Sequence, residues 1–142
     1  EPKNKIMKTL KYTSKSKIEI KNCYLSSKEK IKSLRSLMSK NKIGAYLIPR
    51  ADCFQGEFIS ENDNRLKWIT NFSGSAGLCI VTMKCIVLFV DGRYTIQAEV
   101  EKNNAQILIK KLEKKTIYNW LKKNIFVFNK IRILFSYFSK FW

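Results

Sequence analysis

The thirty residues from Asn71 to Val100 constrain the fold of this chain more than any other stretch. They contain two apolar runs, Leu78–Thr82 and Ile86–Val90, each about five residues long and rich in β-branched side chains. Only three residues separate the runs. Runs of this length and composition are typical of buried strands, and a gap this short favours an antiparallel hairpin. The stretch therefore predicts a buried hairpin that carries much of the core.

Small and polar segments flank the predicted hairpin. Gly74–Gly77 precedes it with the sequence Gly-Ser-Ala-Gly, which suits a tight turn or a close approach of two backbones. The tetrapeptide Asp91–Tyr94 follows it. Because an aspartate before a helical pattern accepts hydrogen bonds from unpaired backbone N–H groups, Asp91 is predicted to cap a helix over Tyr94–Glu101.

The most regular helical pattern lies upstream of the hairpin. Ser26 and Glu29 have the spacing of a capping box, in which the serine caps the helix start and the glutamate returns a hydrogen bond. One apolar stripe follows, formed by Ile31, Leu34, Leu37 and Met38. These features predict a helix from Ser27 to about Lys42, with Gly44 as its stop signal.

Two further strands and two further helices are predicted. The strands cover Ala45–Ile48, closed by Pro49, and Gln106–Ile109. The first helix covers Asn62–Ile69, with Ser60 as its cap and Asp63 in its first turn. The second is the last helix of the chain; Thr116 is predicted to cap it, and it bears Ile117, Trp120 and Leu121 on one face. Helices that alternate with buried strands indicate an α/β fold.

The net charge of +17 is unevenly distributed. It amounts to +10 over residues 1–42, −2 over residues 43–101 and +9 over residues 102–142. The cations are mostly Lys, whereas proteins that read nucleic-acid grooves favour Arg for its bidentate fork. We therefore expect no nucleic-acid partner. The alternative, that the Lys-rich flanks bind nucleic acid or an anionic membrane, predicts an affinity that falls steeply with salt.

One domain of ordinary size with an extension at each end accounts for the 142 residues. Residues 1–24 are predicted to be a Lys-rich solvated extension, and residues 25–126 to form the domain. Residues 127–142 are an aromatic and basic tail whose charges argue against a membrane-spanning helix. We interpret the tail as a truncated or misjoined terminus that would otherwise pack against missing sequence; an interfacial membrane anchor is the alternative.

The absence of histidine removes most catalytic designs. Neither a Ser–His nor a Cys–His nucleophile pair can form, and no segment matches a P-loop. The four cysteines form no CxxC pair and provide no zinc site: Cys23, Cys53, Cys79 and Cys85. We predict no catalytic residue and no metal ligand in this chain. Because no signal peptide or spanning segment is visible, we expect a cytoplasmic protein with reduced cysteines.

Five acidic residues and two arginines remain as candidates for chemistry. Paired carboxylates can act as acid and base, and the candidates are Asp52, Glu57, Glu61, Asp63 and Asp91. Helix starts explain Asp63 and Asp91 better, and turn formation or loop solvation explains Asp52 and Glu57 better. Arg65 and Arg93 stand out against the Lys background. Each is interpreted either as a structural salt-bridge partner or as a clamp for a carboxylate group.

The central stretch resembles a known family, aminopeptidase P, the Xaa-Pro aminopeptidases. Asn71–Gly77 is similar to its GF-x-GSAG segment, Val81-Thr82 to its VT strand end, and Asp91–Ala98 to its DGRY-x-x-QA segment. Upstream, Tyr46–Pro49 resembles its YIIP segment. Further residues fall in the order of its D-x-H-x-SEY and D-x-R motifs: Asp52, Glu57, Asn62, Asp63 and Arg65. The resemblance extends over about residues 27–126.

The resemblance implies a creatinase-like N-terminal domain, with a mixed β-sheet flanked by helices. In the family, a separate C-terminal domain holds two divalent metal ions, usually manganese, that activate water; no part of that domain is found in these residues. The N-terminal domain of the family covers the active-site entrance, helps to form dimers and supplies an Arg near the bound peptide. Arg65 matches that Arg by motif position and is the predicted substrate-binding residue.

This sequence departs from the family pattern at four positions. Phe54, Gly56, Phe58 and Asn71 stand where the family has His, Ser, Tyr and Gly, respectively. We predict the non-catalytic N-terminal domain of an aminopeptidase P-like metallopeptidase, which releases an N-terminal residue preceding proline, and no such activity in this chain alone. Its expected partners are its own catalytic domain or a second subunit, and peptide substrate through the full enzyme. The alternative is a stand-alone protein-interaction module, because the same fold occurs without catalysis in a histone chaperone.

Overall fold

Apolar side chains alternate between two cores along the central strands of the computed structural model, which describes residues 26–51, 58–102, 105–125 and 133–135. On β1 (Ala45–Pro49), Tyr46 and Ile48 belong to one core, and Ala45 and Leu47 to the other. Strands with both faces covered have continuous apolar sequences. This is why both runs of the predicted hairpin lack polar residues at every second position.

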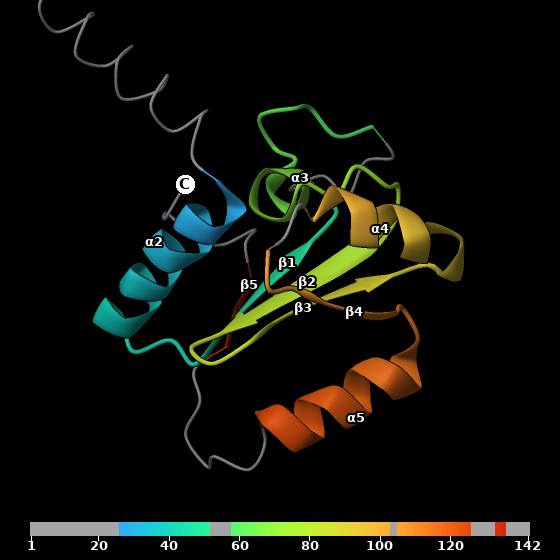
Figure 1. The fold of residues 1–142 in the computed structure, drawn as a ribbon. Helices are drawn as coiled ribbons and strands as arrows, with labels where there is room; N and C mark the ends of the chain where they lie inside the picture. The colour runs from blue at the N-terminus through green and yellow to red at the C-terminus, as the bar shows by residue number, and fades with distance from the viewer. Residues whose placement is uncertain (1–25, 52–57, 103–104, 126–132, 136–142) are drawn as a thin grey trace, which may run out of the picture.

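The sheet is mixed and contains five strands in the order β4-β3-β2-β1-β5 (Figure 1). β2 (Gly77–Thr82) runs antiparallel to β1 and to β3 (Ile86–Val90), and the register of the hairpin extends from Gly77 opposite Val90 to Val81 opposite Ile86. β4 (Leu108–Lys111) is parallel to β3, and β5 (Ile133–Phe135) is parallel to β1. The predicted hairpin and the predicted mixed sheet are both confirmed.

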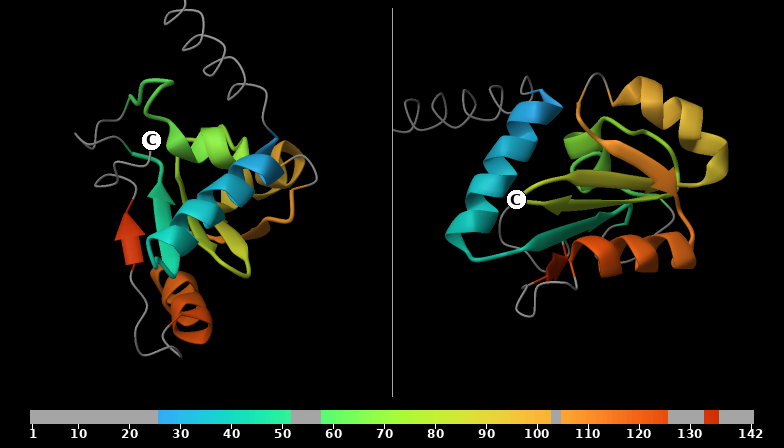
Figure 2. Two further views of the ribbon diagram at one scale, coloured as in Figure 1. Left: turned by 90° about the vertical axis from the view of Figure 1, so that its left-hand side faces the viewer. Right: turned by 60° about the horizontal axis from the view of Figure 1, so that its bottom comes forward.

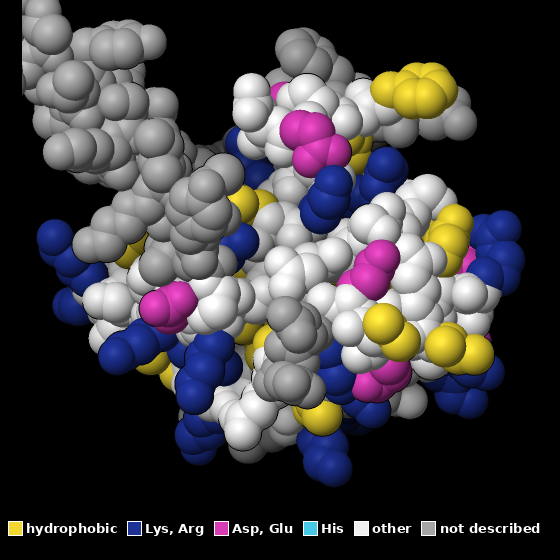
Figure 3. Space-filling model, turned by 45° about the horizontal axis from the view of Figure 1, so that its top comes forward, with side chains coloured by type: hydrophobic (Ala, Val, Ile, Leu, Met, Phe, Trp, Pro, Cys, Tyr) yellow, Lys and Arg dark blue, Asp and Glu magenta, His cyan; other side chains and the backbone are white. Residues whose placement is uncertain are grey.

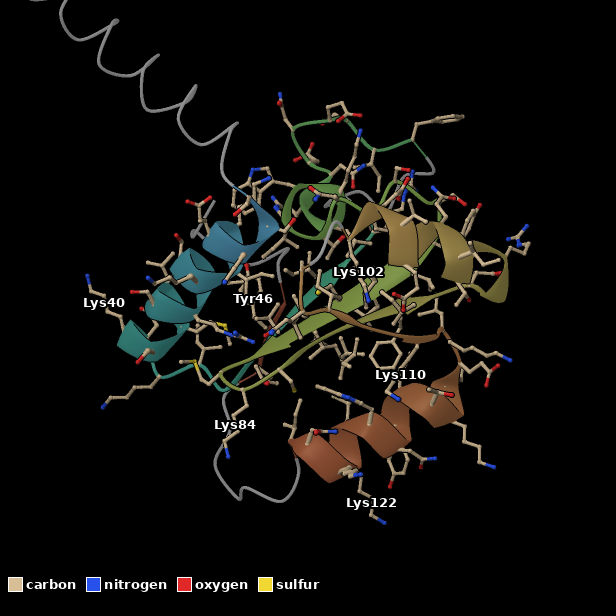
Figure 4. All side chains as sticks on the ribbon, in the orientation of Figure 1. Lys40, Tyr46, Lys84, Lys102, Lys110 and Lys122 are labelled. Carbon is tan, nitrogen blue, oxygen red and sulfur yellow. The ribbon has the colours of Figure 1, made fainter. Side chains whose placement is uncertain are left out.

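Helices cover both faces of the sheet (Figure 2). α2 (Ser27–Lys40), α3 (Arg65–Thr70) and α4 (Thr95–Glu101) contribute to the larger core, in which Tyr46 lies between α2 and the sheet (Figure 4). α5 (Lys114–Asn124) covers the other face, where buried Trp120 meets Phe89 edge-on at 6.1 Å between ring centroids. The α/β prediction is therefore confirmed, with the sheet between two helical layers.

The start of α2 agrees with its prediction and its end does not. The Ser26 Oγ accepts from the Glu29 N–H at 3.3 Å, and Glu29 Oε2 accepts from the Ser26 N–H at 2.8 Å, which confirms the capping box. The helix ends at Lys40, and Lys42 adopts the left-handed conformation with φ of 56°. The N–H of Ile43 then bonds to the carbonyl of Met38, which is a Schellman motif. Gly44 is not the stop signal.

Three other boundaries also differ from prediction. α3 begins at Arg65 with Asn64 as its cap, because Ser60 and Asp63 form a separate turn before it. α5 begins after Glu113, so Thr116 lies within its first turn and does not cap it. Strand β4 starts at Leu108, two residues later than the start predicted at Gln106. Several residues that can cap a helix lie close to the start of α3, and the start of β4 is set by its pairing with β3 from Val87 opposite Leu108.

Strand β5 lies within residues 127–142, the segment predicted to be a tail outside the domain. Its backbone pairs with β1 at Ala45, Tyr46 and Leu47, so residues 133–135 extend the sheet. In the part of the chain that the structure describes, no helix has the length and apolar character needed to cross a membrane.

Candidate functional site

The segments that carry the sequence motifs meet at one edge of the sheet, which we call the motif edge (residues 72–77 and 91–101). β1 and β3 end there and β2 begins there, since Gly77 lies opposite Val90 and its carbonyl accepts from the Arg50 N–H at 2.9 Å. α3 and α4 flank this edge (Figure 1). Turns and helix starts at such an edge are where α/β folds place functional groups.

The two outer glycines of Gly-Ser-Ala-Gly allow close packing at the motif edge. A Cβ atom on Gly74 would lie 2.1 Å from Cζ of Phe72, and one on Gly77 would lie 2.9 Å from Cδ2 of Leu66. Phe72 and Leu66 are each 1% exposed. Close approach, rather than an unusual backbone angle, therefore explains both glycines, because no glycine among the described residues has a positive φ.

Asp91 starts the turn that leads from β3 into α4. Its Oδ1 accepts from the Arg93 N–H at 3.0 Å and so caps a short 3₁₀ turn, Gly92–Tyr94, that precedes the helix. The Arg93 Nε lies 3.1 Å from the same oxygen. Hydrogen bonds from the side chain and backbone of Arg93 hold the pKa of Asp91 below its usual range, and the Asp91 carboxylate raises the pKa of Arg93. Asp91 thus caps this turn and not α4 itself.

Tyr94 ties the start of α4 to the Gly-Ser-Ala-Gly segment. Its hydroxyl lies 2.7 Å from the Ser75 Oγ, and its ring packs edge-on against Phe72 with 6.0 Å between centroids. The ring also lies 5.5 Å from the Arg93 guanidinium carbon, which is within reach of a cation–π contact. Tyr94 is a structural anchor here.

Glu101 closes a second link between the same two segments. Its carboxylate accepts from the Ser73 N–H at 2.8 Å, the Ser73 Oγ at 2.6 Å and the Gln97 amide at 2.9 Å. Partial burial raises the pKa of Glu101, but the hydrogen bonds from Ser73 and Gln97 and the charge of Lys67 outweigh burial and lower it. Sequence patterns did not predict this link, because Ser73 and Glu101 are 28 positions apart.

The motif edge leaves a cation and two apolar side chains on its outer surface. The Arg93 side chain is 75% exposed, and Ile96 and Val100 on α4 are 82% and 74% exposed. A Cβ atom on Gly92 would meet nothing within 4 Å. Isolated hydrophobic side chains lie among the charges on the face shown in Figure 3. Unlike Gly74 and Gly77, Gly92 is not required by the packing of this domain.

Two further arginines lie near this edge. Arg65, the predicted substrate-binding residue, is the first residue of α3, and among the described residues its side chain has no hydrogen-bond or ion-pair partner. Arg50 directly follows β1, and its Nε is buried without a hydrogen-bond partner. A buried donor without a partner is costly and points to a ligand or neighbour. Arg50 was not predicted as a site residue, although it is an Arg at a strand end in a Lys-rich chain.

The acidic candidates serve structural purposes where they are described. Glu61 pairs with Lys67 at 3.0 Å, and Asp63 Oδ2 accepts from the Ser60 hydroxyl at 2.8 Å. Asp52 and Glu57 lie outside the described residues, as do Phe54 and Gly56. Within residues 26–51, 58–102 and 105–125, no three His, Cys, Asp or Glu side chains are grouped to hold a metal ion. Cys79 is a core residue, and burial raises the pKa of its thiol.

The comparisons with known proteins agree with this architecture. Residues 30–135 match the family model of the creatinase/prolidase N-terminal domain. The chain is 37% identical over 107 residues to Xaa-Pro aminopeptidase 1 of Dictyostelium discoideum, covering 74% of this chain and 17% of that protein. It is 41% identical over 103 residues to Aminopeptidase P2 of Arabidopsis thaliana, covering 70% and 14%, respectively. The chain thus spans about a sixth of the length of these relatives.

A solved structure shares the same fold. The X-prolyl aminopeptidase of Caenorhabditis elegans, described as a cytosolic enzyme with a di-nuclear active site, superposes with a TM-score of 0.68 and 28% identity. The match covers 78% of this chain and 20% of that enzyme.

Proposed function

The chain belongs to the creatinase/prolidase N-terminal domain family, in the form found in Xaa-Pro aminopeptidases, and we propose that it covers the active-site entrance of such an enzyme and aids its assembly. The whole enzyme would release an N-terminal residue that precedes proline and would work in the cytoplasm as a dimer. The catalytic domain, with a pair of divalent metal ions that activate water, would be its own C-terminal domain or belong to a second subunit.

The outer surface of the motif edge is the observation that carries this proposal. The inner groups of the edge bond to one another, whereas Ile96 and Val100 face outward beside the open space at Gly92, and Arg93, although bonded to Asp91, keeps most of its side chain exposed. A glycine that its own domain does not require lets another backbone or a ligand approach closely. These groups are therefore assigned to the contact with the catalytic domain.

Arg65 is assigned to the peptide substrate, and Arg50 is a second candidate for the same contact. A guanidinium binds a carboxylate through two parallel hydrogen bonds, which suits either a peptide terminus or an acidic side chain. The side chain of Arg65 has no hydrogen-bond or ion-pair partner among the described residues, so it is free of them to bind a carboxylate. The buried Nε of Arg50 would gain a hydrogen-bond partner on binding.

A peptidase assay tests the proposal. The 142-residue chain and the longest product of the same gene are incubated with manganese and a Xaa-Pro peptide. We expect cleavage by the longer product alone, and turnover by the short chain would overturn the proposal. In the longer product, Arg65→Ala should raise KM several-fold, whereas Lys122→Gln, on α5 at the other face of the sheet, should not. An unchanged KM in Arg65→Ala would remove Arg65 from the substrate contact.

A further inference from the structure

A groove on α2 has the properties of a ligand site and does not belong to the motif edge. It has a volume of about 380 Å³, which lies within the range of small-molecule sites in proteins. Its lining residues come from α2, the start of β3 and the segment before β4: Lys28, Ile31, Lys32, Arg35, Ile86, Ala105 and Gln106. Ile86 begins β3 and Asp91 follows its end, so the groove lies at the opposite end of that strand.

Three of the lining residues are cations and none is acidic. Lys28, Lys32 and Arg35 are four and three positions apart, so they line one face of α2 over a rise of about 10 Å. Within the part of the chain that the structure describes, Lys28 and Lys32 have no hydrogen-bond or ion-pair partner. Like charges at this spacing repel one another. A bound anion would relieve that repulsion.

Lys30, a fourth cation on α2, differs from these three because it packs against α3. The Lys30 ammonium donates to the Trp68 carbonyl at 2.8 Å and lies 4.9 Å from the centroid of the Trp68 ring. Lys30 therefore connects α2 to α3 and does not line the groove. Among the described residues, Lys28, Lys32 and Arg35 make no hydrogen bond or ion pair to α3.

Arg35 is held in place from the sheet side. Its Nε donates to the Thr82 carbonyl at 2.8 Å, which leaves the two terminal nitrogens of its guanidinium to bind an anion. A side chain that is already oriented loses less entropy when it binds. Arg35 thus provides a fixed anchor at one end of the row, with the two exposed lysines toward the other end.

The floor of the groove is apolar. Ile31, Ile86 and Ala105 belong to the larger core and are each less than 9% exposed, so each contributes a small apolar surface to the lining of the groove. An inorganic anion would leave this apolar surface uncovered. A ligand with a short hydrocarbon body would cover it while its charged ends meet Arg35 and the lysines.

We propose that this groove binds a small organic dianion, such as a medium-chain dicarboxylate, whose apolar middle lies on Ile31, Ile86 and Ala105 and whose carboxylates meet Arg35 and the pair Lys28 and Lys32. An eight-carbon dicarboxylate separates its charges by about the 10 Å over which the cations extend. Residues 1–24 carry the same sign of charge as the groove, so they are not its natural occupant.

The test is a titration of the isotope-labelled full chain, followed by NMR, with three compounds of equal length: octanedioate, octanoate and 1,8-octanediol. We expect octanedioate to shift the amide signals of Arg35, Ile86, Ala105 and Gln106, octanoate to bind several-fold more weakly, and the diol to cause no change. Equal binding of the diol, or shifts spread over lysines throughout the chain, would overturn the proposal.

Substitution of the groove lysines tests whether they contact the ligand. Lys28→Gln with Lys32→Gln should weaken octanedioate binding about two- to five-fold for each lysine, because each is an exposed contact. Lys40→Gln is the matched control, since Lys40 lies at the far end of α2 and points away from the domain (Figure 4). Equal losses in the control would overturn the proposal. The peptide acetyl-Glu-Leu-Glu-amide is the competing ligand: tighter binding of the peptide, with the same response to the variants, would assign the groove to an acidic protein segment instead.

Discussion

The two ends of strand β3 differ in how their polar side chains are used. At the motif edge, where β3 ends, Asp91 bonds to Arg93, Tyr94 to Ser75, and Glu101 to Ser73. At the α2 groove, where β3 begins, Lys28 and Lys32 line a cavity that holds no acidic side chain. At the end that carries nearly all of the family resemblance, the polar side chains thus bond mostly to one another. At the end without a recognisable motif, the lysines have no partner among the described residues.

In this domain, the sequence motifs and the unpaired cations lie at opposite ends of the same strand, so a motif and a binding site need not coincide. Most residues of the Gly-Ser-Ala-Gly and Asp-Gly-Arg-Tyr segments have a structural reason in this domain, from the close approach at Gly74 to the cap at Asp91. Only the outward groups of the motif edge are left for a neighbour.

The two glycines at Gly74 and Gly92 should respond oppositely to the same substitution. Gly74→Ala should lower the free energy of unfolding by about 1–3 kcal/mol, because its Cβ would overlap the buried Phe72 ring. Gly92→Ala should change it by less than about 0.5 kcal/mol, because its Cβ would meet nothing. Urea unfolding of the two variants measures both values. Similar losses would mean that Gly92 is also a packing residue.

Removing one hydroxyl at the motif edge should have a smaller effect. Tyr94→Phe loses the hydrogen bond to Ser75 and should cost about 0.5–1 kcal/mol of stability in urea unfolding. Tyr118→Phe is the matched control, since Tyr118 is 60% exposed on α5. If both variants matched the wild type, the bond between Tyr94 and Ser75 would contribute nothing to the link.

The link through Glu101 should weaken in acid. Its pKa is lower in the folded state than its ordinary value of 4.5, so its stabilisation is complete above about pH 4.5 and is lost as the pH falls through the lowered value. Glu101→Gln should therefore be less stable than the wild type at pH 7, and the difference should shrink as the pH falls below 4.5. Unfolding temperatures measured from pH 7 to pH 3 check this. A difference that did not depend on pH would show that packing alone is involved.

Neutralising the groove cations should slightly stabilise the domain. Lys28→Gln with Lys32→Gln removes repulsion between neighbours on α2 and should raise the free energy of unfolding by a few tenths of a kcal/mol. Lys67→Gln, which loses the ion pair to Glu61, should lower it instead. Urea unfolding at low ionic strength should show a rise in the free energy of unfolding for the groove variant and a fall for Lys67→Gln. High salt should reduce both changes. A loss of stability in the groove variant would mean that its lysines are paired.

The elements that sequence patterns predicted well have local causes. The capping box at Ser26 and the apolar alternation of the hairpin each lie within a few residues, so both could be recognised without the fold. The prediction that Gly44 stops α2 was wrong because a lysine, Lys42, adopts the left-handed conformation that usually belongs to glycine. The helix starts after Ser60 and before Thr116 were misplaced because Asn64 caps α3 in place of Ser60, and because α5 begins after Glu113 without a side-chain cap.

The candidate site was harder to predict than the fold. Its links join residues 19 to 28 positions apart, as between Ser75 and Tyr94 or Ser73 and Glu101, and no local pattern indicates such pairs. The α2 groove was also missed, because its cations belong to a Lys-rich background in which no single lysine stands out. The buried Nε of Arg50 could be recognised only in three dimensions.

Strand β4 has a consequence for how this domain can associate. It is an outer strand of the sheet with only four residues, and Lys110 and Lys111 are exposed on it. A short, positively charged outer strand repels a second copy of itself and gives little length for backbone pairing. We therefore expect that the sheet does not continue from one molecule to the next at β4.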